Sequence, residues 1–460
     1  MMAANEVAAL QAENQALRQE VAALREQNTA LQAQLDAALA RIAELENRPK
    51  EPPAFVKPNT PKRERKPRRK RQPEYNRARR LEPPTRIEQH ALDRCPDCGQ
   101  RLHGGTLARR RQVIELPAPQ PVEVIEPQII KRWCSWCHRW QAPTLDLRGQ
   151  VLDQCRLGVR IASLIAFLRH TLRLPLRRIQ AYLQTVHHLR ISTGEITELL
   201  HHVRRATQVE VDKLKAHARA SPILHADETS WREAGQSGYI WAFSTPGDEG
   251  VRYYEYDPSR AGAVAKRLLG GTFAGHLVTD FYAGYNIYAG KHQRCWVHLL
   301  RDLHALREEH AADSETLAWV KEVRKLYEEA QAFVRGAEPP SQEAREAQYV
   351  RLVEQVHTLG LQYARVSAHP CNALAKRLLR HEDELFQFVL VAGLSADNNL
   401  AERSIRPVVV VRKISGGTQS PEGSKTRMAL ASLFETWQAR GLNPFEECLK
   451  LLRQTPLPQI

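Results

Sequence analysis

The sequence predicts a multidomain α+β protein, and three patterns support this fold class. Apolar residues recur every seven positions through residues 1–48, two Cys-x-x-Cys pairs lie within residues 91–150, and alternating apolar runs begin at residue 222. Helical periodicity fills residues 151–220 and 300–395. Because a domain usually contains about 100–200 residues, a chain of 460 residues can bury several hydrophobic cores.

The charge of the chain is unevenly distributed. Its 67 Lys and Arg residues exceed its 52 Asp and Glu residues, for a net charge of +15. Residues 1–220 carry +16, residues 221–400 carry −5 and residues 401–460 carry +4. This distribution predicts a polyanionic partner. The sequence contains no apolar run of the ~20 residues that a membrane helix needs and no signal peptide, so we expect a cytosolic protein that does not contact membranes.

Residues 1–48 predict a parallel, two-stranded coiled coil. Six heptads place mainly Val, Ile or Asn at position a and mainly Leu at position d, which is the pattern of a dimeric zipper. The residues expected in the dimer seam include Leu10, Asn14, Leu17, Val21, Leu24, Asn28 and Leu31. Asn at position a favours the dimer and fixes its register. The alternative, a single solvated helix, leaves the apolar stripe uncovered.

Residues 49–90 form a basic, proline-rich linker. Between Pro61 and Arg80 the sequence contains eleven Lys or Arg residues and two Glu residues. Its longest basic run is Arg68, Arg69, Lys70 and Arg71. Repeated Pro residues exclude a continuous helix. The segment is either a solvated tether or a non-specific contact to phosphate groups.

Residues 91–150 predict a module that binds one structural Zn²⁺. Cys95 and Cys98 form one Cys-x-x-Cys knuckle, and after 35 residues Cys134 and Cys137 form a second. Four thiolates suit the tetrahedral coordination of zinc. Apolar runs at residues 113–116, 122–125 and 129–133 read as strands of a zinc ribbon. A redox-active pair and unliganded thiols are the alternatives.

Residues 151–220 predict helices with the pattern of a helix-turn-helix. Residues 188–192 connect two amphipathic helices, and Ser192 or Thr193 can cap the second. In a helix-turn-helix two short helices pack together, and the second enters the major groove of DNA. An ordinary helical hairpin shows the same pattern. The residues that could contact phosphates are Arg177, Arg178, Arg190, Arg204 and Arg205.

Residues 221–420 predict a mixed sheet that carries carboxylates at its strand ends. Strands are expected at 223–231, 238–244 and 251–256, a helix at 261–269 and a returning strand at 275–280. Three antiparallel strands, a helix and a returning strand are the order of a ribonuclease H-like fold, in which the first and fourth strands lie side by side. Asp227 and Asp280, which end those two strands, would then be neighbours.

A third carboxylate, Glu402, follows a helical insertion over about 300–395. It lies on a short helix that Pro407 limits, with Arg403, Arg406, Arg412 and Lys413 as possible phosphate contacts. Three carboxylates can hold two Mg²⁺ ions for phosphodiester chemistry, although surface carboxylates are also common. Glu228 and Asp397 are rival ligands. His225 shares the face of Asp227 and either lines the site or packs in the core.

The order of these segments resembles the insertion-sequence-66 family of bacterial DDE transposases. The residues that carry the resemblance are His225-Ala-Asp227-Glu-Thr, Val278-Thr-Asp280, Cys295-Trp-Val-His298 and Asp397-Asn-Asn-Leu-Ala-Glu402-Arg, followed by Arg406-Pro407. It extends over nearly the whole chain, including the helical tail at 421–460. The resemblance implies that Asp227, Asp280 and Glu402 are the catalytic triad and that the Cys-Trp-x-His stretch supports the site.

The resemblance further implies a dimeric DNA transposase of the bacterial cytoplasm and nucleoid. It would use two Mg²⁺ ions, or Mn²⁺, to cleave DNA at terminal inverted repeats and to join the freed end to target DNA. Accessory proteins of the same element are implied as partners. Two other functions stay open: a DNA-binding regulator or domesticated relic without activity, and a structure-specific nuclease of the same fold.

Overall fold

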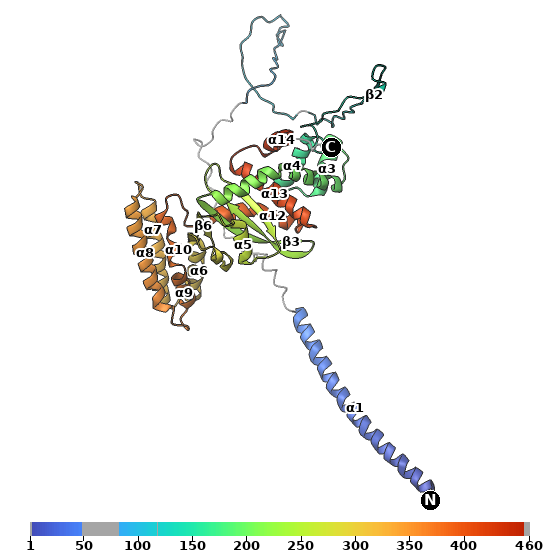
Figure 1. The fold of residues 1–460 in the computed structure, drawn as a ribbon, viewed down its shortest axis with the longest axis vertical. Helices are drawn as coiled ribbons and strands as arrows, with labels where there is room; N and C mark the ends of the chain where they lie inside the picture. The colour runs from blue at the N-terminus through green and yellow to red at the C-terminus, as the bar shows by residue number, and fades with distance from the viewer. Residues whose placement is uncertain (1, 48–81, 117, 455–460) are drawn as a thin grey trace. The chain divides into compact units, whose positions relative to one another are not determined.

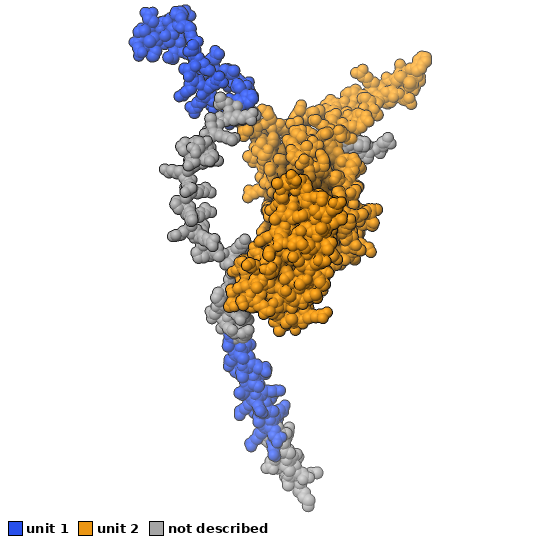
Figure 2. Space-filling model, turned by 90° about the vertical axis from the view of Figure 1, so that its left-hand side faces the viewer, with its two compact units in different colours: residues 1–115 blue, residues 116–460 orange. Residues whose placement is uncertain are grey.

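The computed structural model describes residues 2–47, 82–116 and 118–454, and within the first range it describes the side chains of residue 15 and of residues 17–40. The chain divides into two compact units, residues 1–115 and residues 116–460 (Figure 2). The basic run Arg68, Arg69, Lys70 and Arg71 lies outside the described residues.

Unit 1 contains one long helix, α1 (Met2–Asn47). Of the residues predicted for the dimer seam, Leu17, Val21, Leu24, Asn28 and Leu31 are exposed on this helix, with Leu31 63 % exposed. The side chains of Leu10 and Asn14 lie outside the described ones. Among the described helices, none combines the length and the apolarity that a membrane span requires.

The first helices of unit 2 are α2 (Val159–His170), α3 (Leu176–His187) and α4 (Thr193–Ala220). The connection before α4 is the predicted one: the Ser192 hydroxyl accepts a hydrogen bond from the Glu195 N–H at 3.0 Å. The prediction of two short helices is wrong for α4, which has 28 residues. Apolar residues from Ile196 to Ala218 line one face of α4 and bury against the sheet and neighbouring helices, so tertiary packing extends the helix.

A mixed five-stranded sheet forms the centre of unit 2 (Figure 1). Its strands, in chain order, are β3 (Ile223–Glu233), β4 (Gln236–Ser244), β5 (Arg252–Asp257), β6 (His276–Thr279) and β7 (His292–Arg294). The spatial order is β5-β4-β3-β6-β7. β3 pairs antiparallel with β4 and parallel with β6. The predicted neighbourhood of the first and fourth strands is therefore confirmed, and β7 is an additional strand.

Helices cover both faces of this sheet. Alternating side chains of the strands divide between them: Ile240, Ala242 and Tyr254 pack in one core with helix α12 (Asn399–Ser415), whereas Trp241, Phe243 and Tyr253 pack in another core with α4 and with α5 (Gly262–Leu269). The architecture is α+β, and its strand order is consistent with a ribonuclease H-like core.

A helical insertion with its own apolar core connects β7 to α12. Its helices are α6 (Trp296–Glu309), α7 (Ser314–Val334), α8 (Gln342–Tyr363), α9 (Asn372–Arg380), α10 (Glu382–Leu385) and α11 (Gln387–Leu390). In Figure 1 α7 and α8 stand beside the sheet as an antiparallel pair. Fully buried Trp296 packs in this core together with Val278 of β6, which joins the insertion to the sheet. Its indole N–H donates to the Leu385 carbonyl of α10 at 2.5 Å.

Helix α12 continues through Pro407, so the prediction that this proline limits the helix is wrong. A proline inside a helix costs about 3 kcal/mol. Ile405, Val408 and Val411 on either side of it are buried against Trp231 of the sheet, and this apolar burial offsets the cost. The chain then forms α13 (Pro421–Ala439) and α14 (Pro444–Gln454), which pack into the core of unit 2.

The strands predicted between the two cysteine knuckles are mostly absent. Residues 113–116 and 122–125 form no strand, and most of their apolar side chains are exposed, including Val113 and Val124. Among the described residues no strand pairs with either segment, so both lack the cross-strand contacts that stabilise a sheet. The third predicted strand is present only in part, as β1 (Arg132–Cys134), which pairs with β2 (Arg139–Gln141) in a short hairpin.

Candidate active site

Asp227 and Asp280 lie at the same level of neighbouring parallel strands. The pairing of β3 with β6 includes His225 opposite Val278, and each aspartate follows its partner by two residues. Both side chains are half-buried. Asp227 accepts a hydrogen bond from the Glu228 N–H and Asp280 accepts one from the Tyr282 N–H, each at 2.9 Å. The sheet thus places the two predicted aspartates on adjacent strands. The prediction that Asp227 ends its strand is wrong, because pairing with β4 extends β3 to Glu233.

The antiparallel register places Asp227 on the face that α12 covers. Asp227 is opposite Ala242, which packs against α12, whereas Glu228 is opposite Trp241 on the other face. The Glu228 carboxylate is occupied there: Arg260 Nη2 donates to one oxygen and the Tyr285 hydroxyl to the other, both at 2.6 Å. Glu228, a rival ligand, therefore has structural partners for both of its oxygens.

Glu402 lies in the first turn of α12, above the face that carries Asp227. A carboxylate is favoured at this position because a helix N-terminus carries partial positive charge. Burial raises the pKa of Asp227 to about 7, and the nearby negative charges of Glu228, Asp280 and Glu402 act in the same direction. Oε1 of Glu402 is buried and has no hydrogen-bond partner. The three predicted carboxylates thus share one electrostatic environment that disfavours their joint ionisation.

Asp397, the second rival ligand, helps to begin α12, since its carboxylate accepts a hydrogen bond from the Asn399 N–H at 3.0 Å. The next residue, Asn398, is buried and connects α12 to β3. Its side-chain amide donates to the Ala226 carbonyl at 2.8 Å, and its oxygen lies 3.1 Å from Nδ1 of His225. Burial lowers the pKa of His225 to about 4. His225 is therefore a packed, neutral histidine that positions the helix.

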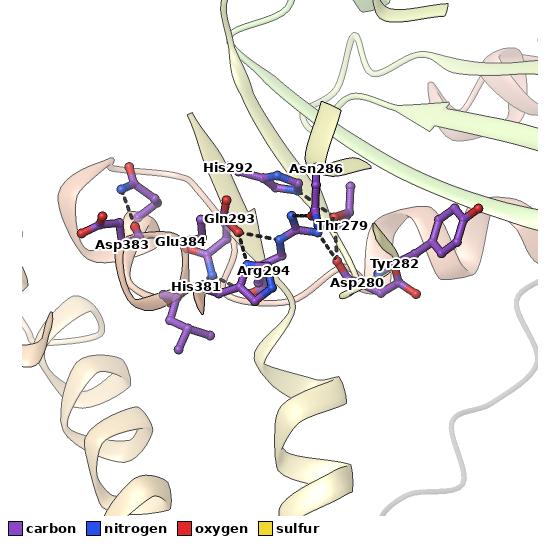
Figure 3. A network of polar contacts seen from close by, with 12 residues as sticks. Thr279, Asp280, Tyr282, Asn286, His292, Gln293, Arg294, His381, Asp383 and Glu384 are labelled. Carbon is purple, nitrogen blue, oxygen red and sulfur yellow. Dashed lines mark hydrogen bonds and ion pairs between the residues drawn. The ribbon is translucent and has the colours of Figure 1, made fainter. Parts of the chain in front are cut away.

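Sequence reasoning did not identify Arg294, which holds the backbone around Asp280 (Figure 3). This fully buried side chain donates to the Asp280 carbonyl at 2.9 Å and to the Asn286 side chain at 2.5 Å. Its Nε donates to Glu384 at 2.6 Å, so a helix of the insertion neutralises it. The only signal in the sequence is an arginine inside a short, otherwise buried segment beside Cys295.

The predicted DNA-contacting residues have different surroundings. Arg177, Arg178 and Arg190 on and after α3 are exposed, as are Arg403, Arg406 and Lys413 on α12. Arg204 pairs with Glu422 at 2.7 Å and Arg205 with Glu198 at 3.1 Å. Arg412 donates to the Thr229 hydroxyl at 2.9 Å, which ties α12 to β3. The exposed arginines and Lys413 are therefore freer to contact phosphates than Arg204 and Arg205, which pair with glutamates.

Each cysteine pair occupies a tight turn that favours thiolates. In unit 1 the Gly99 N–H donates to the Cys95 carbonyl at 2.9 Å, and Gly99 has φ +72°, as the predicted turn requires. In unit 2 the Cys137 N–H points to Cys134 Sγ at 3.4 Å. Backbone N–H groups of the knuckles lower the pKa of Cys95 and of Cys134. Both turns therefore suit metal-binding thiolates.

These features define a class of protein: an α+β chain whose mixed five-stranded sheet carries one aspartate within β3 and a second directly after the adjacent parallel strand β6. Residues 154–426 match the family described as "Transposase IS66 family". This range includes the sheet, the helical insertion and all three carboxylates. The chain belongs to the IS66 transposase family.

Similar curated proteins come from Sinorhizobium fredii and are themselves uncharacterised. The chain is 26 % identical to the protein y4qI over 318 residues, which cover 62 % of this chain and 57 % of y4qI. It is also 26 % identical to y4jD over 261 residues, covering 51 % and 50 %, and 27 % identical to y4jO over 176 residues, covering 38 % and 51 %. The matched part thus spans about half the length of these relatives.

Proposed function

We propose that this chain is an active DDE transposase that cleaves DNA at the ends of its element and joins the freed 3′ ends to target DNA. The observation that carries this proposal is the convergence of Asp227, Asp280 and Glu402, which is reflected in the pKa of about 7 for Asp227. All three residues lie within the range that matches the transposase family.

The donor set fits magnesium. All three side chains offer carboxylate oxygens, which Mg²⁺ prefers, and the negative charges of Asp280 and Glu402 help to raise the pKa of Asp227. Bound divalent cations would relieve the repulsion among the carboxylates. Asp227, Asp280 and Glu402 would hold two Mg²⁺ ions, or Mn²⁺, which activate the attacking oxygen and stabilise the leaving oxygen of a phosphodiester.

The reaction would consist of two in-line displacements at phosphorus. First, water attacks the phosphodiester at the element end and the 3′ oxygen leaves as a 3′-OH. This 3′-OH then attacks a phosphodiester of the target, forming one P–O bond while the target's own 3′ oxygen leaves. The chain forms no covalent intermediate. Arg294 and Asn398 would hold Asp280 and α12 in place, and exposed Arg403 and Arg406 flank Glu402 where DNA phosphates would pass.

Basic elements outside the active site would hold the terminal inverted repeats. Exposed Arg177, Arg178 and Arg190 suit phosphate contacts, whereas Arg204 and Arg205 would first have to leave Glu422 and Glu198. The linker at 49–90 would add non-specific affinity. Cys95, Cys98, Cys134 and Cys137 would bind one structural Zn²⁺ and organise residues 91–150. We infer the bacterial cytoplasm and nucleoid as the location, and accessory proteins of the element as further partners.

The exposed apolar stripe of α1 supports a homodimer. Leu17, Leu24 and Leu31 recur every seven residues and are each more than half exposed on the single helix. In a parallel coiled coil the same residues would be buried against a second copy. A dimer would present two active sites, as the joining of two element ends requires.

The decisive experiment measures cleavage and strand transfer on DNA that carries the element's own ends. Asp280→Asn should reduce Mg²⁺-dependent cleavage by about 10³-fold or more, because metal ions contribute several kcal/mol to such reactions, while DNA binding stays nearly unchanged. The exposed Asp248→Asn is the matched control. Unchanged cleavage by the Asp280 variant would refute the site.

The same assay separates the two alternatives. A structure-specific nuclease would cleave DNA but would not join a pre-cut 3′ end to a target. A regulator or domesticated relic would bind the ends and perform neither reaction. The presence of carboxylates at all three positions favours the active enzyme.

A further inference from the structure

A second group of metal-binding side chains lies beside the proposed magnesium site. Cys295, His298 and Glu402 each offer one ligand atom, and these three atoms lie within 4.8 Å of one another. Among the described residues, this is the set of Cys, His, Asp or Glu side chains that lies close enough together to hold one metal ion. Cys295 is the N-cap of α6 and His298 lies in its first turn. Glu402 comes from the first turn of α12, so two helix N-termini bring the three residues together.

The distance between His298 and Glu402 is slightly longer than that between two ligands of one zinc ion. Nε2 of His298 lies 3.7 Å from Oε1 of Glu402, which is too long for a hydrogen bond. Nitrogen and oxygen ligands of one tetrahedral zinc ion, each at about 2.0–2.2 Å from it, stand roughly 3.3–3.6 Å apart. Oε1 of Glu402 is buried without a hydrogen-bond partner, and so is Nδ1, the other ring nitrogen of His298. The protein alone therefore satisfies neither the carboxylate oxygen nor that nitrogen.

The third residue supplies sulfur in a fixed position. Cys295 is fully buried, and its Sγ accepts a hydrogen bond from the Asn398 N–H at 3.2 Å. Asn398 is itself anchored to the Ala226 carbonyl of β3. Such hydrogen bonds orient a metal-binding thiolate and support its charge. The sulfur therefore faces the imidazole and the carboxylate from a rigid part of the fold.

We propose that Cys295, His298 and Glu402 bind one thiophilic divalent cation of the zinc class, with a fourth position open to water or substrate. Sulfur and imidazole ligands select zinc, cobalt or iron over magnesium. Glu402 would be shared, with Oε1 directed to this ion and its second oxygen available to the magnesium site. The proposal goes beyond the proposed function, because it concerns an additional ion that can bind whether or not the chain transposes DNA.

The test measures zinc content of the full-length protein without DNA. Metal-free protein is dialysed against Zn²⁺ in a large excess of Mg²⁺, which keeps zinc from the carboxylate site, and bound zinc is measured by mass spectrometry. Cys295→Ser and His298→Ala should each bind one equivalent less than the wild type. Cys371→Ser is the control, because Cys371 is also fully buried but lies outside the cluster.

Replacement with Co²⁺ provides a second readout. The wild type should show a thiolate-to-cobalt absorption component that both cluster variants lack and that Cys371→Ser retains. Because His298 is partly exposed, with 28 % of its side chain accessible, His298→Ala should keep the fold, which circular dichroism checks. Equal zinc content and cobalt spectra in wild type and His298→Ala would overturn the proposal, including when DNA cleavage by the variant falls. Unchanged metal binding together with reduced cleavage would instead make His298 a positioning residue for Glu402.

Discussion

The buried arginine Arg294 shows how single residues set the geometry of the candidate active site. Its guanidinium group contacts the backbone of Asp280 and the side chains of Asn286 and Glu384. Charged groups are rarely fully buried unless they are paired, and Glu384 supplies the pairing charge here. One carboxylate of the helical insertion thereby stabilises the arginine that holds the backbone at Asp280.

The Arg294–Glu384 pair predicts a pH-dependent stability. Burial opposes the charge of Glu384, but the hydrogen bond from His381 and the charge of Arg294 outweigh it and lower the pKa of Glu384 from 4.5 to about 2. His292 contributes little at neutral pH, because burial lowers its own pKa to about 3. Since the folded-state pKa is lowered, the carboxylate stabilises the fold above pH 4.5, and this stabilisation is lost as the pH falls towards 2.

Glu384→Gln should therefore lower the free energy of unfolding by about 2 kcal/mol at pH 7. The difference from the wild type should shrink below pH 4.5 and disappear near pH 2. Urea unfolding across this pH range measures both quantities. The exposed Glu338→Gln is the control and should have no comparable effect. A difference that does not depend on pH would show that the carboxylate charge is not what stabilises the fold.

At the scale of elements, the apolar stripe of α1 is buried only if a second copy of the helix packs against it. Leu17→Ser, Leu24→Ser and Leu31→Ser combined should weaken dimerisation by more than about 10³-fold, because each buried Leu contributes about 2 kcal/mol. Analytical ultracentrifugation measures the change. Gln19→Ser with Glu26→Ser, on the opposite face of the same heptads, is the matched control. A dimer of unchanged affinity in the Leu variant would assign dimerisation to another element.

The two cysteine knuckles depend on a bound zinc ion for their proposed role. Cys95→Ser should remove about one zinc ion per chain relative to the wild type, because one missing thiolate opens a four-ligand site. Metal analysis after dialysis measures this, and Cys155→Ser, an isolated half-buried cysteine, is the control. Full zinc retention by the Cys95 variant would contradict the four-cysteine site.

At the scale of the whole molecule, the segregation of charge predicts how DNA binding responds to salt. If six to ten phosphates meet basic residues, affinity should fall about 10³–10⁵-fold between 50 and 200 mM salt. Replacing residues 61–80 with a Gly/Ser segment of equal length should make the slope of log affinity against log salt distinctly shallower. Fluorescence anisotropy measures the slope. An unchanged slope would mean that this segment is only a solvated tether.

Local patterns in the sequence were enough to predict several features. The strands and α5 follow from alternating and helical periodicity, and the Ser192 cap follows from its side chain and its spacing to Glu195. The expected side-by-side placement of the first and fourth strands is also confirmed. The three carboxylates were recognisable because two of them end predicted strands and the third lies in a family signature that the match to residues 154–426 supports.

Other features depend on contacts between residues that are distant in sequence. Continuation of α12 through Pro407, the 28-residue length of α4 and the absence of strands at 113–116 are decided by which surfaces become buried, which local propensity does not contain. The same is true of Arg294, whose partners include residues up to 90 positions away. The separation of Asp227 from Glu228, in contrast, follows from the alternation of side chains along a strand. Sequence periodicity determined most of the strands and helices around the central sheet, and side-chain chemistry determined which residues are able to act. Only the tertiary structure decided which of those residues meet, because packing and electrostatic pairing act across the fold rather than along the chain.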